Sequence, residues 1–376
     1  MIGMQMAPMD TLFFRDGTPF SAGSASQEDV GGVFPPHPVT MTGAIRAALA
    51  RLNGWNGSGR WLPELNQILG DGPEDIGEIS VDGPFLVRDD RPLFAAPRHL
   101  LGSIKGGQWI PRVLLRPGPG VACDLGDAVR LPEVPAVEGA FDILTPGDGW
   151  WLTQAGMRAV LRGEIPPRTE IVPSARLWCQ ERRVGIERDN ATRTAREGML
   201  YSTRHVRLMA GVTLGVRVAG VPERWTLPFG HLVSIGGEAR LVECQPWDAE
   251  LVIDQPLAKI EAHGRAVLVA LTPLDLPAGI CAGRSLLDSL GDMRVVSACL
   301  SRPERIGGWD SLTRRPLPLG CALPTGSVLF CEIGDRQRFR DAVAATDGVP
   351  RVGARQQWGF GLVALGVWPS ESEVTS

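Results

Sequence analysis

Short apolar runs separated by glycine and proline constrain the fold of this chain more than any other feature. The 376 residues include 46 glycines and 31 prolines, and both residue types interrupt regular structure and favour turns. Beyond residue 200 the runs alternate with period two or are continuously apolar, which predicts strands. These runs are residues 212–218, 231–235, 266–271, 294–300, 327–333 and 362–368.

The first hundred residues predict a strand, a helix and a hairpin, in that order. This order is half of a ferredoxin-like βαββαβ unit, so we predict an α+β fold. The helix is marked by apolar residues at i, i+3, i+4 and i+7, namely Ile45, Ala48, Leu49 and Leu52. We expect strands at 4–14, 79–87 and 93–100, a second helix at 150–162, and irregular chain at 54–75 and 102–147.

The start of the first helix is a candidate anion site. Prolines within 34–38 give the chain a sharp entry to the helix, and we expect Thr40 or Thr42 to be its N-cap. The positive end of the helix dipole, these hydroxyls and the exposed backbone at Gly43 could together hold a phosphate. Ordinary capping of a structural helix explains the same residues equally well.

Several classes of site are disfavoured by composition. The seven cysteines form no C-x-x-C pair and the five histidines form no H-E-x-x-H motif, so we expect buried thiols and neither a metal nor a cofactor. The glycine-rich stretch 351–361 lacks the Gly-Lys-Ser/Thr ending of a P-loop and does not fit G-x-G-x-x-G. No run approaches the roughly 20 apolar residues of a membrane span and no signal peptide is recognisable, so we expect a cytoplasmic protein without membrane contact.

Positive charge is concentrated in one part of a chain whose net charge is −4. Eleven arginines and six acidic residues lie between Arg158 and Arg207, and the chain has only two lysines. The segment 181–198 has too few apolar residues to be buried, so we expect an exposed hairpin or loop. Such a segment can follow a phosphate backbone, although a solvated loop without a ligand has the same composition.

Residues 199–208 read as a strand with a mixed face. Tyr201, Thr203, His205 and Arg207 would point to the same side. An aromatic ring, an imidazole and a guanidinium suit stacking and phosphate contact with single-stranded RNA. Metal-free RNA cleavage by general acid–base chemistry and a purely structural face are the alternatives.

Seven segments, in order along the chain, resemble one known family. They are DTLFFRDGTPF (10–20), FPPHPVTMTGAIRAAL (34–49), RVGIERDNATRTAREGMLY (183–201), SIGGEAR (234–240), GGWDSLTRRPLPL (307–319), PTGSVLFCEI (324–333) and QQWGFGLVALGVW (356–368). The chain resembles the RAMP subunit of type III-B (Cmr) CRISPR effector complexes, of the "three" type that caps the 5′ tag of the guide RNA.

The resemblance implies two ferredoxin-like (RRM-like) RAMP domains with long insertions and a C-terminal glycine-rich loop. We place them at 1–165 and 205–376, with a basic, thumb-like hairpin insertion at 166–204. It also implies that the protein holds the 5′ tag of the crRNA. The implied protein partners are the large polymerase/cyclase-like subunit and the backbone RAMP subunit next to the 5′ end.

The residues that the resemblance assigns to RNA binding lie in four segments, which are the turn at 15–20, the helix start, the basic stretch and the glycine-rich loop. They are Arg15, Thr40, Thr42, Arg46, Arg182, Arg183, Arg193, Arg196, Tyr201, Arg204, His205, Arg355, Gln357, Gly359, Phe360 and Gly361. The family role is not catalytic. The alternatives are a metal-independent endoribonuclease that processes crRNA with His205 and Tyr201, and with His37 as a third candidate, and a scaffold that contacts only protein.

Overall fold

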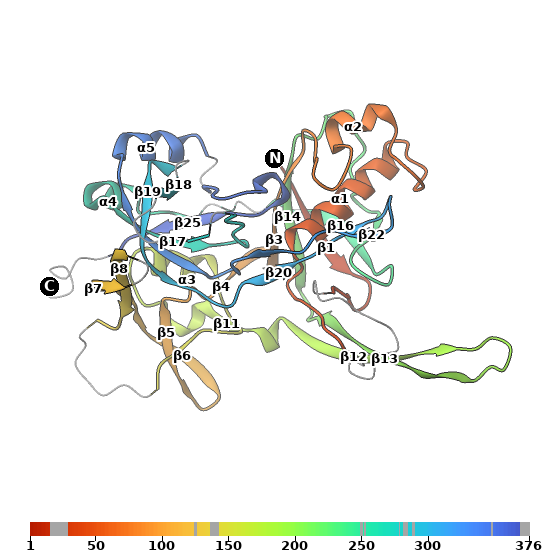
Figure 1. The fold of residues 1–376 in the computed structure, drawn as a ribbon, viewed down its shortest axis with the longest axis horizontal. Helices are drawn as coiled ribbons and strands as arrows, with labels where there is room; N and C mark the ends of the chain where they lie inside the picture. The colour runs from red at the N-terminus through yellow and green to blue at the C-terminus, as the bar shows by residue number, and fades with distance from the viewer. Residues whose placement is uncertain are drawn as a thin grey trace.

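The computed structural model describes residues 1–15, 29–123, 126–135, 143–248, 251, 253–277, 279–280, 285–287, 290–346 and 349–368. Two large sheets organise this α+β fold (Figure 1). The first has eight strands in the order β11-β10-β4-β3-β14-β1-β16-β15, and every neighbouring pair is antiparallel. Its strands are β1 (Ile2–Pro8), β3 (Ser80–Arg88), β4 (Arg91–Ala95), β10 (Trp150–Leu152), β11 (Ile171–Pro173), β14 (Val212–Ala219), β15 (Leu232–Ser234) and β16 (Leu241–Pro246).

The second sheet has five strands in the order β18-β19-β24-β17-β25, and its neighbours are also antiparallel. Its strands are β17 (Arg265–Ala270), β18 (Ser285–Leu287), β19 (Met293–Cys299), β24 (Val328–Ile333) and β25 (Val363–Gly366). The helices are α1 (Pro38–Leu52), α2 (Pro63–Leu69), α3 (Gln154–Leu161), α4 (Leu257–His263) and α5 (Arg336–Ala344), with 3-10 turns η1 (Arg168–Glu170), η2 (Ser174–Arg176) and η4 (Gln356–Trp358).

Smaller hairpins are inserted between these elements. β5 (Leu100–Lys105) pairs with β6 (Gln108–Leu114) and with β9 (Thr145–Pro146), and β7 (Arg116–Cys123) pairs with β8 (Gly126–Glu133). A long hairpin of β12 (Trp178–Arg188) and β13 (Ala195–Leu208) projects from the body (Figure 1). The short strand β2 (Asp29–Val30) pairs with β13. A narrow arm contains β20 (Glu304–Ile306), β21 (Trp309–Asp310), β22 (Arg315–Pro316) and β23 (Gly320–Ala322).

The alternation of side chains along the strands divides the interior into three cores. On β3, Val81 and Leu86 pack into a first core with α1, whereas Phe85 and Val87 pack into a second core. This second core also contains Val267 and other residues of the second sheet, so it lies between the two sheets. The third core covers the other face of the second sheet beneath α4 and α5. β3 is therefore buried on both faces, and its residues from Val81 to Val87 are all buried.

Several predictions need correction. Pro38 begins α1 with His37 at the N-cap, so neither Thr40 nor Thr42 caps it, because a proline already fits the first helical position. The opening strand ends at Pro8 rather than at 14. Residues 102–147, predicted as irregular, contribute strands β5 to β9, since proline and glycine are tolerated in edge hairpins. Helix α2 lies within 54–75, which was also predicted to be irregular.

The predicted division at 204/205 does not coincide with the sheets. Residues 205–246 supply β14, β15 and β16, which belong to the first sheet. A period-two pattern identifies a strand but not its pairing partner, so the sequence alone could not show that these strands join the first sheet. The segment 166–204, in contrast, contains most of the exposed β12–β13 hairpin.

A buried carboxylate joins the two halves of the molecule. Asp82 on β3 is 1% exposed and accepts hydrogen bonds of 2.7 Å from Nη2 of Arg217 on β14 and from Nη2 of Arg351, which precedes β25. Arg217 and Arg351 have side chains that are 14% and 23% exposed. A buried ion pair with one partner removed leaves an uncompensated charge, which is strongly destabilising.

We therefore expect Asp82→Asn to lower the free energy of unfolding by about 3 kcal/mol, at the low end for buried pairs because both arginines keep some solvent contact. The midpoint of urea unfolding measures this loss. Asp89→Asn is the control, because Asp89 is an exposed residue paired only with the neighbouring Arg88, and we expect a change of at most about 0.5 kcal/mol. Equal effects of the two substitutions would contradict the proposed role of Asp82.

Candidate nucleic-acid interface

The motifs found in the sequence gather at two places. Residues 10–15, 183–201 and 234–240 meet where the β12–β13 hairpin leaves the body, through the bridge Leu12↔Val206 and the bond from Gly237 N to Phe13 O. We call this place the hairpin root. Residues 34–49 and 356–361 meet where Thr42 Oγ1 donates to the Trp358 carbonyl at 3.1 Å. We call this place the helix–loop junction.

Two arginines at the hairpin root are already neutralised. Arg183 donates to Asp10 at 3.0 Å and to Glu181 at 2.9 Å. Arg207 donates to Asp10 at 3.0 Å and to Glu181 at 2.7 Å. The hydrogen bond from Arg183 is the main cause that lowers the pKa of Asp10 to about 2, and the bond from Arg207 is the main cause that lowers the pKa of Glu181. These ion pairs therefore neutralise part of the positive charge that the sequence concentrates in this region.

His205 is enclosed at the same root. Its ring is fully buried, stacks on Phe13 at a centroid distance of 5.0 Å, and has Thr11 Oγ1 3.1 Å from Nδ1. Thr203 Oγ1 and Glu238 Oε2 lie 3.1 and 3.3 Å from Nε2. Burial is the main cause that lowers the pKa of His205. Both ring nitrogens are occupied within the protein, so this conformation offers neither of them to an RNA.

Exposed guanidinium groups lie further along the hairpin. Arg182 and Arg204 face each other across the two strands and are both exposed, and Arg182 donates to Ser202 Oγ at 3.1 Å. Arg193 is exposed in the turn, with a φ of 58°. The side chain of Arg196 and residues 16–20 of the predicted turn lie outside the described part of the chain. Arg15 is exposed and pairs with Gly32 near the root.

Tyr201 lies further along the hairpin than His205. Its side chain is 38% exposed and stands directly opposite Gly185. A Cβ at position 185 would lie 2.4 Å from Cζ of the tyrosine, so the ring lies over the glycine. The predicted face is thus divided, because Tyr201 and Arg207 remain exposed while Thr203 and His205 are buried.

Arg46 at the helix–loop junction has a structural position. It is 5% exposed and donates to the carbonyls of Gly72 and Asp75 at 3.0 and 2.8 Å. Its guanidinium also lies 5.4 Å and 5.3 Å from the ring centroids of Trp61 and Trp358. Burial lowers its pKa to about 10, so it stays charged at neutral pH. Like Thr42, which is completely buried, it packs the protein and is not available at the surface.

The glycine-rich loop packs onto the first sheet. Gly359 has a φ of 96°, and a Cβ there would lie 2.6 Å from the Gly83 carbonyl oxygen, so only glycine fits. Phe360 is fully buried and carries the Arg355 guanidinium 4.2 Å from its ring centroid, while Arg355 Nε donates to Asp275 at 2.6 Å. Gly361 is also buried. Gln357 is exposed and Thr40 is half-buried, which leaves these two predicted residues accessible.

A family model described as "CRISPR-associated protein (Cas_Cmr3)" matches residues 4–368. The chain belongs to this family. The resemblance predicted from the seven motifs is thereby confirmed. The search of curated proteins gave no match.

Some solved structures are similar to this Cmr3-family protein at low sequence identity. One is a chain of a "Type III-B Cmr-beta bound to cognate target RNA", with 17% identity, a TM-score of 0.49, and 87% of this chain and 86% of that one covered. A second Cmr-beta structure, with target RNA and AMPPnP, has 17% identity, a TM-score of 0.48 and coverage of 92% and 90%. A chain of a "Csm3-Csm4 subcomplex" of type III-A has 11% identity, a TM-score of 0.40 and coverage of 89% and 94%.

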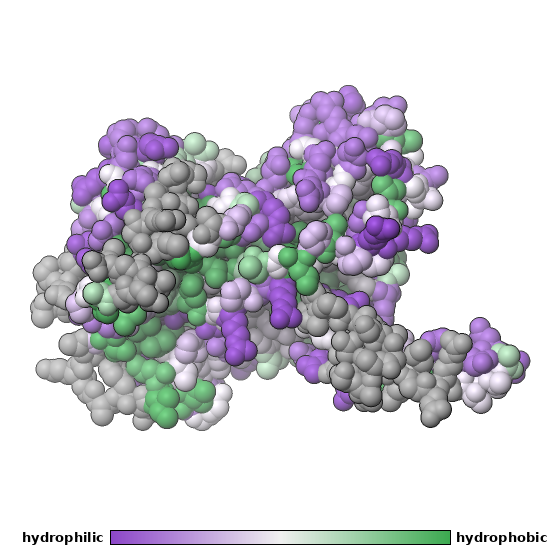
Figure 2. Space-filling view, viewed as in Figure 1, coloured by the Kyte–Doolittle hydropathy of each residue, from purple (hydrophilic) through white to green (hydrophobic). Residues whose placement is uncertain are grey.

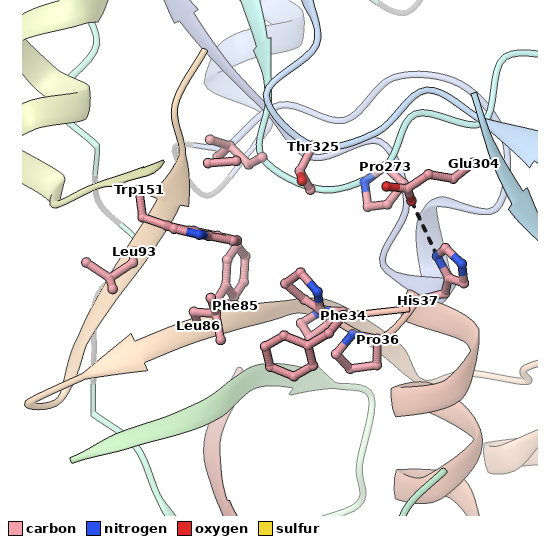
Figure 3. Close-up of a pocket in the computed structure, with 14 residues that line it drawn as sticks. Phe34, Pro36, His37, Phe85, Leu86, Leu93, Trp151, Pro273, Glu304 and Thr325 are labelled. Carbon is pink, nitrogen blue, oxygen red and sulfur yellow. Dashed lines mark ion pairs between the residues drawn. The ribbon is translucent and has the colours of Figure 1, made fainter. Parts of the chain in front are cut away.

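A pocket that sequence reasoning missed lies where the two halves of the Cmr3-family protein meet. Phe34, Phe85 and Trp151 form apolar walls, and Thr325, Pro273 and Glu304 approach from the second half (Figure 3). His37 Nδ1 and Glu304 Oε2 form an ion pair of 3.5 Å at one end, and burial raises the pKa of Glu304. No local sequence signal could have paired two residues so far apart.

The described residues lack two further features. Within them, no three His, Cys, Asp or Glu side chains are grouped to hold a metal ion. No helix in the described part is long and apolar enough to span a membrane. Cys244, Cys299 and Cys331 are buried as expected, whereas Cys179 and Cys321 are exposed, contrary to the expectation of buried thiols.

The enclosure of His205 predicts a pH dependence of stability. Its folded pKa lies below the ordinary value of 6.5, so below about pH 6.5 the unfolded chain binds a proton that the folded chain does not, and stability falls as pH falls. We expect His205→Gln to reduce the slope of unfolding free energy between pH 7.5 and 5.5 by at most about 1.4 kcal/mol per pH unit. Urea midpoints at both pH values measure it, and an unchanged slope would refute the assignment.

Proposed function

We propose that this protein is a non-catalytic RNA-binding subunit of a type III-B CRISPR ribonucleoprotein, and that it holds the 5′ tag of the crRNA in antiviral defence. The observation that carries the proposal is the β12–β13 hairpin, which projects from the body and presents Arg182, Arg193 and Arg204 to solvent. Exposed guanidinium groups on an extended hairpin suit contact with a flexible phosphate backbone. Membership of the Cmr3 family supports an RNA partner.

We also propose that each large sheet is built on a ferredoxin-like unit. In the first sheet, β3-β14-β1-β16 has the spatial order second, third, first and fourth strand, with α1 after the first strand. In the second sheet, β19-β24-β17-β25 has the same order, with α5 after the third strand. This arrangement is that of RRM-like domains. It supports the expected two RAMP domains, with the hairpin and other strands as insertions.

The proposed protein partners are the large polymerase/cyclase-like subunit and the backbone RAMP subunit beside the 5′ end of the guide. An apolar patch over β5 and β6, visible in Figure 2 at the lower left, supplies a surface suited to protein contact. Ile104 on β5 is 66% exposed. Exposed apolar groups of this kind commonly mark protein interfaces. The patch lies apart from the hairpin, so protein and RNA could be bound at the same time.

Guide retention should distinguish the two classes of hairpin arginine. Arg182→Gln with Arg193→Gln removes two exposed guanidiniums, and we expect the slope of log K against log salt to fall by about 1.4, since each lost phosphate contact on a single strand contributes about 0.7. Arg183→Gln with Arg207→Gln is the charge-matched control. These arginines already bind Asp10 and Glu181, so we expect a smaller change.

The measurement is dissociation of labelled guide RNA from the reconstituted complex between 50 and 200 mM salt. Equal slopes for both double variants would show that the exposed hairpin arginines carry no special role. A complex that retains the guide with an unchanged slope in both cases would remove the hairpin from the RNA path altogether.

The enclosed imidazole leads us to expect no cleavage. Purified full-length protein incubated with end-labelled repeat RNA in EDTA should leave the RNA intact, because the His205 and His37 side chains are both buried. Denaturing gel electrophoresis follows the RNA, and a known metal-independent ribonuclease serves as the positive control. A specific cut that disappears in His205→Ala would establish the endoribonuclease alternative instead.

A further inference from the structure

The arm formed by residues 304–322 reaches from the second half of the molecule across to the first. Figure 1 shows β20 and β22 of this arm crossing toward α1. β20 pairs with β23 at the base of the arm, and β21 pairs with β22 further out. The base lies beside the glycine-rich loop, since a Cβ at Gly320 would be 3.8 Å from Nη2 of Arg355.

The arm is held firmly at its base. Ile306 and Ala322 are 2% and 3% exposed and belong to the first core, although the chain reaches them from the second half. Glu304 adds the ion pair with His37. Their inward positions leave the neighbouring Arg305 and Cys321 on the outside. The base is therefore anchored by burial of apolar side chains, and the outward residues have a fixed direction.

The turn at the end of the arm is also ordered by its own hydrogen bonds. The Asp310 carboxylate accepts from the backbone N–H groups of Leu312 and Thr313 at 2.9 and 3.3 Å, and from Thr313 Oγ1 at 2.6 Å. The Leu317 N–H donates to the Gly308 carbonyl at 3.0 Å, which closes the hairpin. A turn ordered in this way presents its side chains without a large entropy cost on binding.

An exposed aromatic ring stands on this ordered turn. All eleven tryptophans of the chain lie in the described part, and Trp309 alone among them is exposed, at 60%. Its partner across the hairpin is Pro316, and Asp310 beside it pairs with Arg315. A ring that is 60% exposed on an ordered turn can stack on a ligand with a flat face.

The charge around Trp309 is positive on balance, with several arginines near the ionised Asp310. Arg302, Arg305, Arg314 and Arg315 are all exposed. In the part of the chain that the structure describes, none of these four forms an ion pair with a carboxylate, in contrast to Arg183 and Arg207 at the hairpin root. The two acidic groups of the arm are engaged elsewhere, Glu304 with His37 and Asp310 with its own turn. The end of the arm near β22 is correspondingly hydrophilic in Figure 2.

We propose that this arm is a second RNA-binding surface, on which Trp309 stacks on an unpaired base and Arg305, Arg314 and Arg315 contact the phosphates beside it. Aromatic stacking next to guanidinium groups is the common means of holding single-stranded nucleic acid. The proposal rests on the proposed function in that RNA is the partner. It adds a site that is separate from the β12–β13 hairpin and continuous with the glycine-rich loop.

The test is photo-crosslinking in the reconstituted complex. The guide RNA, or in a parallel arm a complementary target RNA, carries 4-thiouridine, and tryptic peptides attached to RNA are identified by mass spectrometry. Cleavage after Arg305 and Arg314 releases residues 306–314 with Trp309. We expect this peptide to be crosslinked, and the strand that carries the label identifies the source of the RNA.

Two variants measure how much the arm contributes to RNA binding. Trp309→Leu should weaken binding of a single-stranded oligonucleotide to the full chain by between about fivefold and 150-fold, the range for loss of one stacked base. Arg314→Gln with Arg315→Gln should lower the salt slope by about 1.4. Arg338→Gln with Arg340→Gln, on the exposed side of α5, removes equal charge and should leave binding unchanged. All substituted side chains are exposed, and unchanged melting temperatures verify folding.

The outcomes separate this proposal from the proposed function. Crosslinks to the β12–β13 hairpin but none to residues 306–314 would overturn the arm site and leave the proposed function standing. A crosslink from the arm to another protein subunit would also overturn it, since it would make the arm a protein-docking element. Failure of every peptide of this chain to crosslink to RNA would refute the proposed function itself.

Discussion

The arrangement of the two halves depends on the two ion pairs that Asp82 forms. The carboxylate is buried on β3, and it is bound by Arg217 from the same sheet and by Arg351 from the chain leading into the second sheet. Two charge-assisted bonds at 2.7 Å fix both the position and the direction of that chain. Gly359 can then lie against Gly83 on the same strand, and the glycine-rich loop follows a single path.

Arginine serves two different purposes in this protein, and burial and pairing separate them. Arg46 donates hydrogen bonds to backbone carbonyl oxygens and Arg351 donates to a carboxylate, and both are packing residues. Arg182 and Arg315, in contrast, project into solvent from hairpins. A chain with a net charge of −4 can thus be acidic overall and still present local positive surfaces. Net charge is therefore a weak indicator of binding to a polyanion. The positions of exposed guanidinium groups are a better indicator.

Strands with strong period-two patterns were predictable, and so was the exposure of the hairpin. β14 and β24 lie within a residue of the predicted limits, because their alternation directly reflects one buried face. The neutralisation of Arg183 was not predictable, because Asp10 lies 173 residues away in the sequence. The burial of Arg46 and His205 has the same origin, since Trp358 and Phe13 come from distant segments. The local sequence gives the residue types and the hydrophobic period of a strand. The residues that a side chain contacts are determined by the tertiary fold.

The bond between Thr42 and the Trp358 carbonyl spans 316 residues. Contacts of such separation form late, because a long loop must close before they yield any stabilisation. Helix α1 precedes in the chain the loop that supplies this carbonyl acceptor. The junction therefore depends on closure of the whole chain between helix α1 and the glycine-rich loop, and a fragment without that loop would lack it.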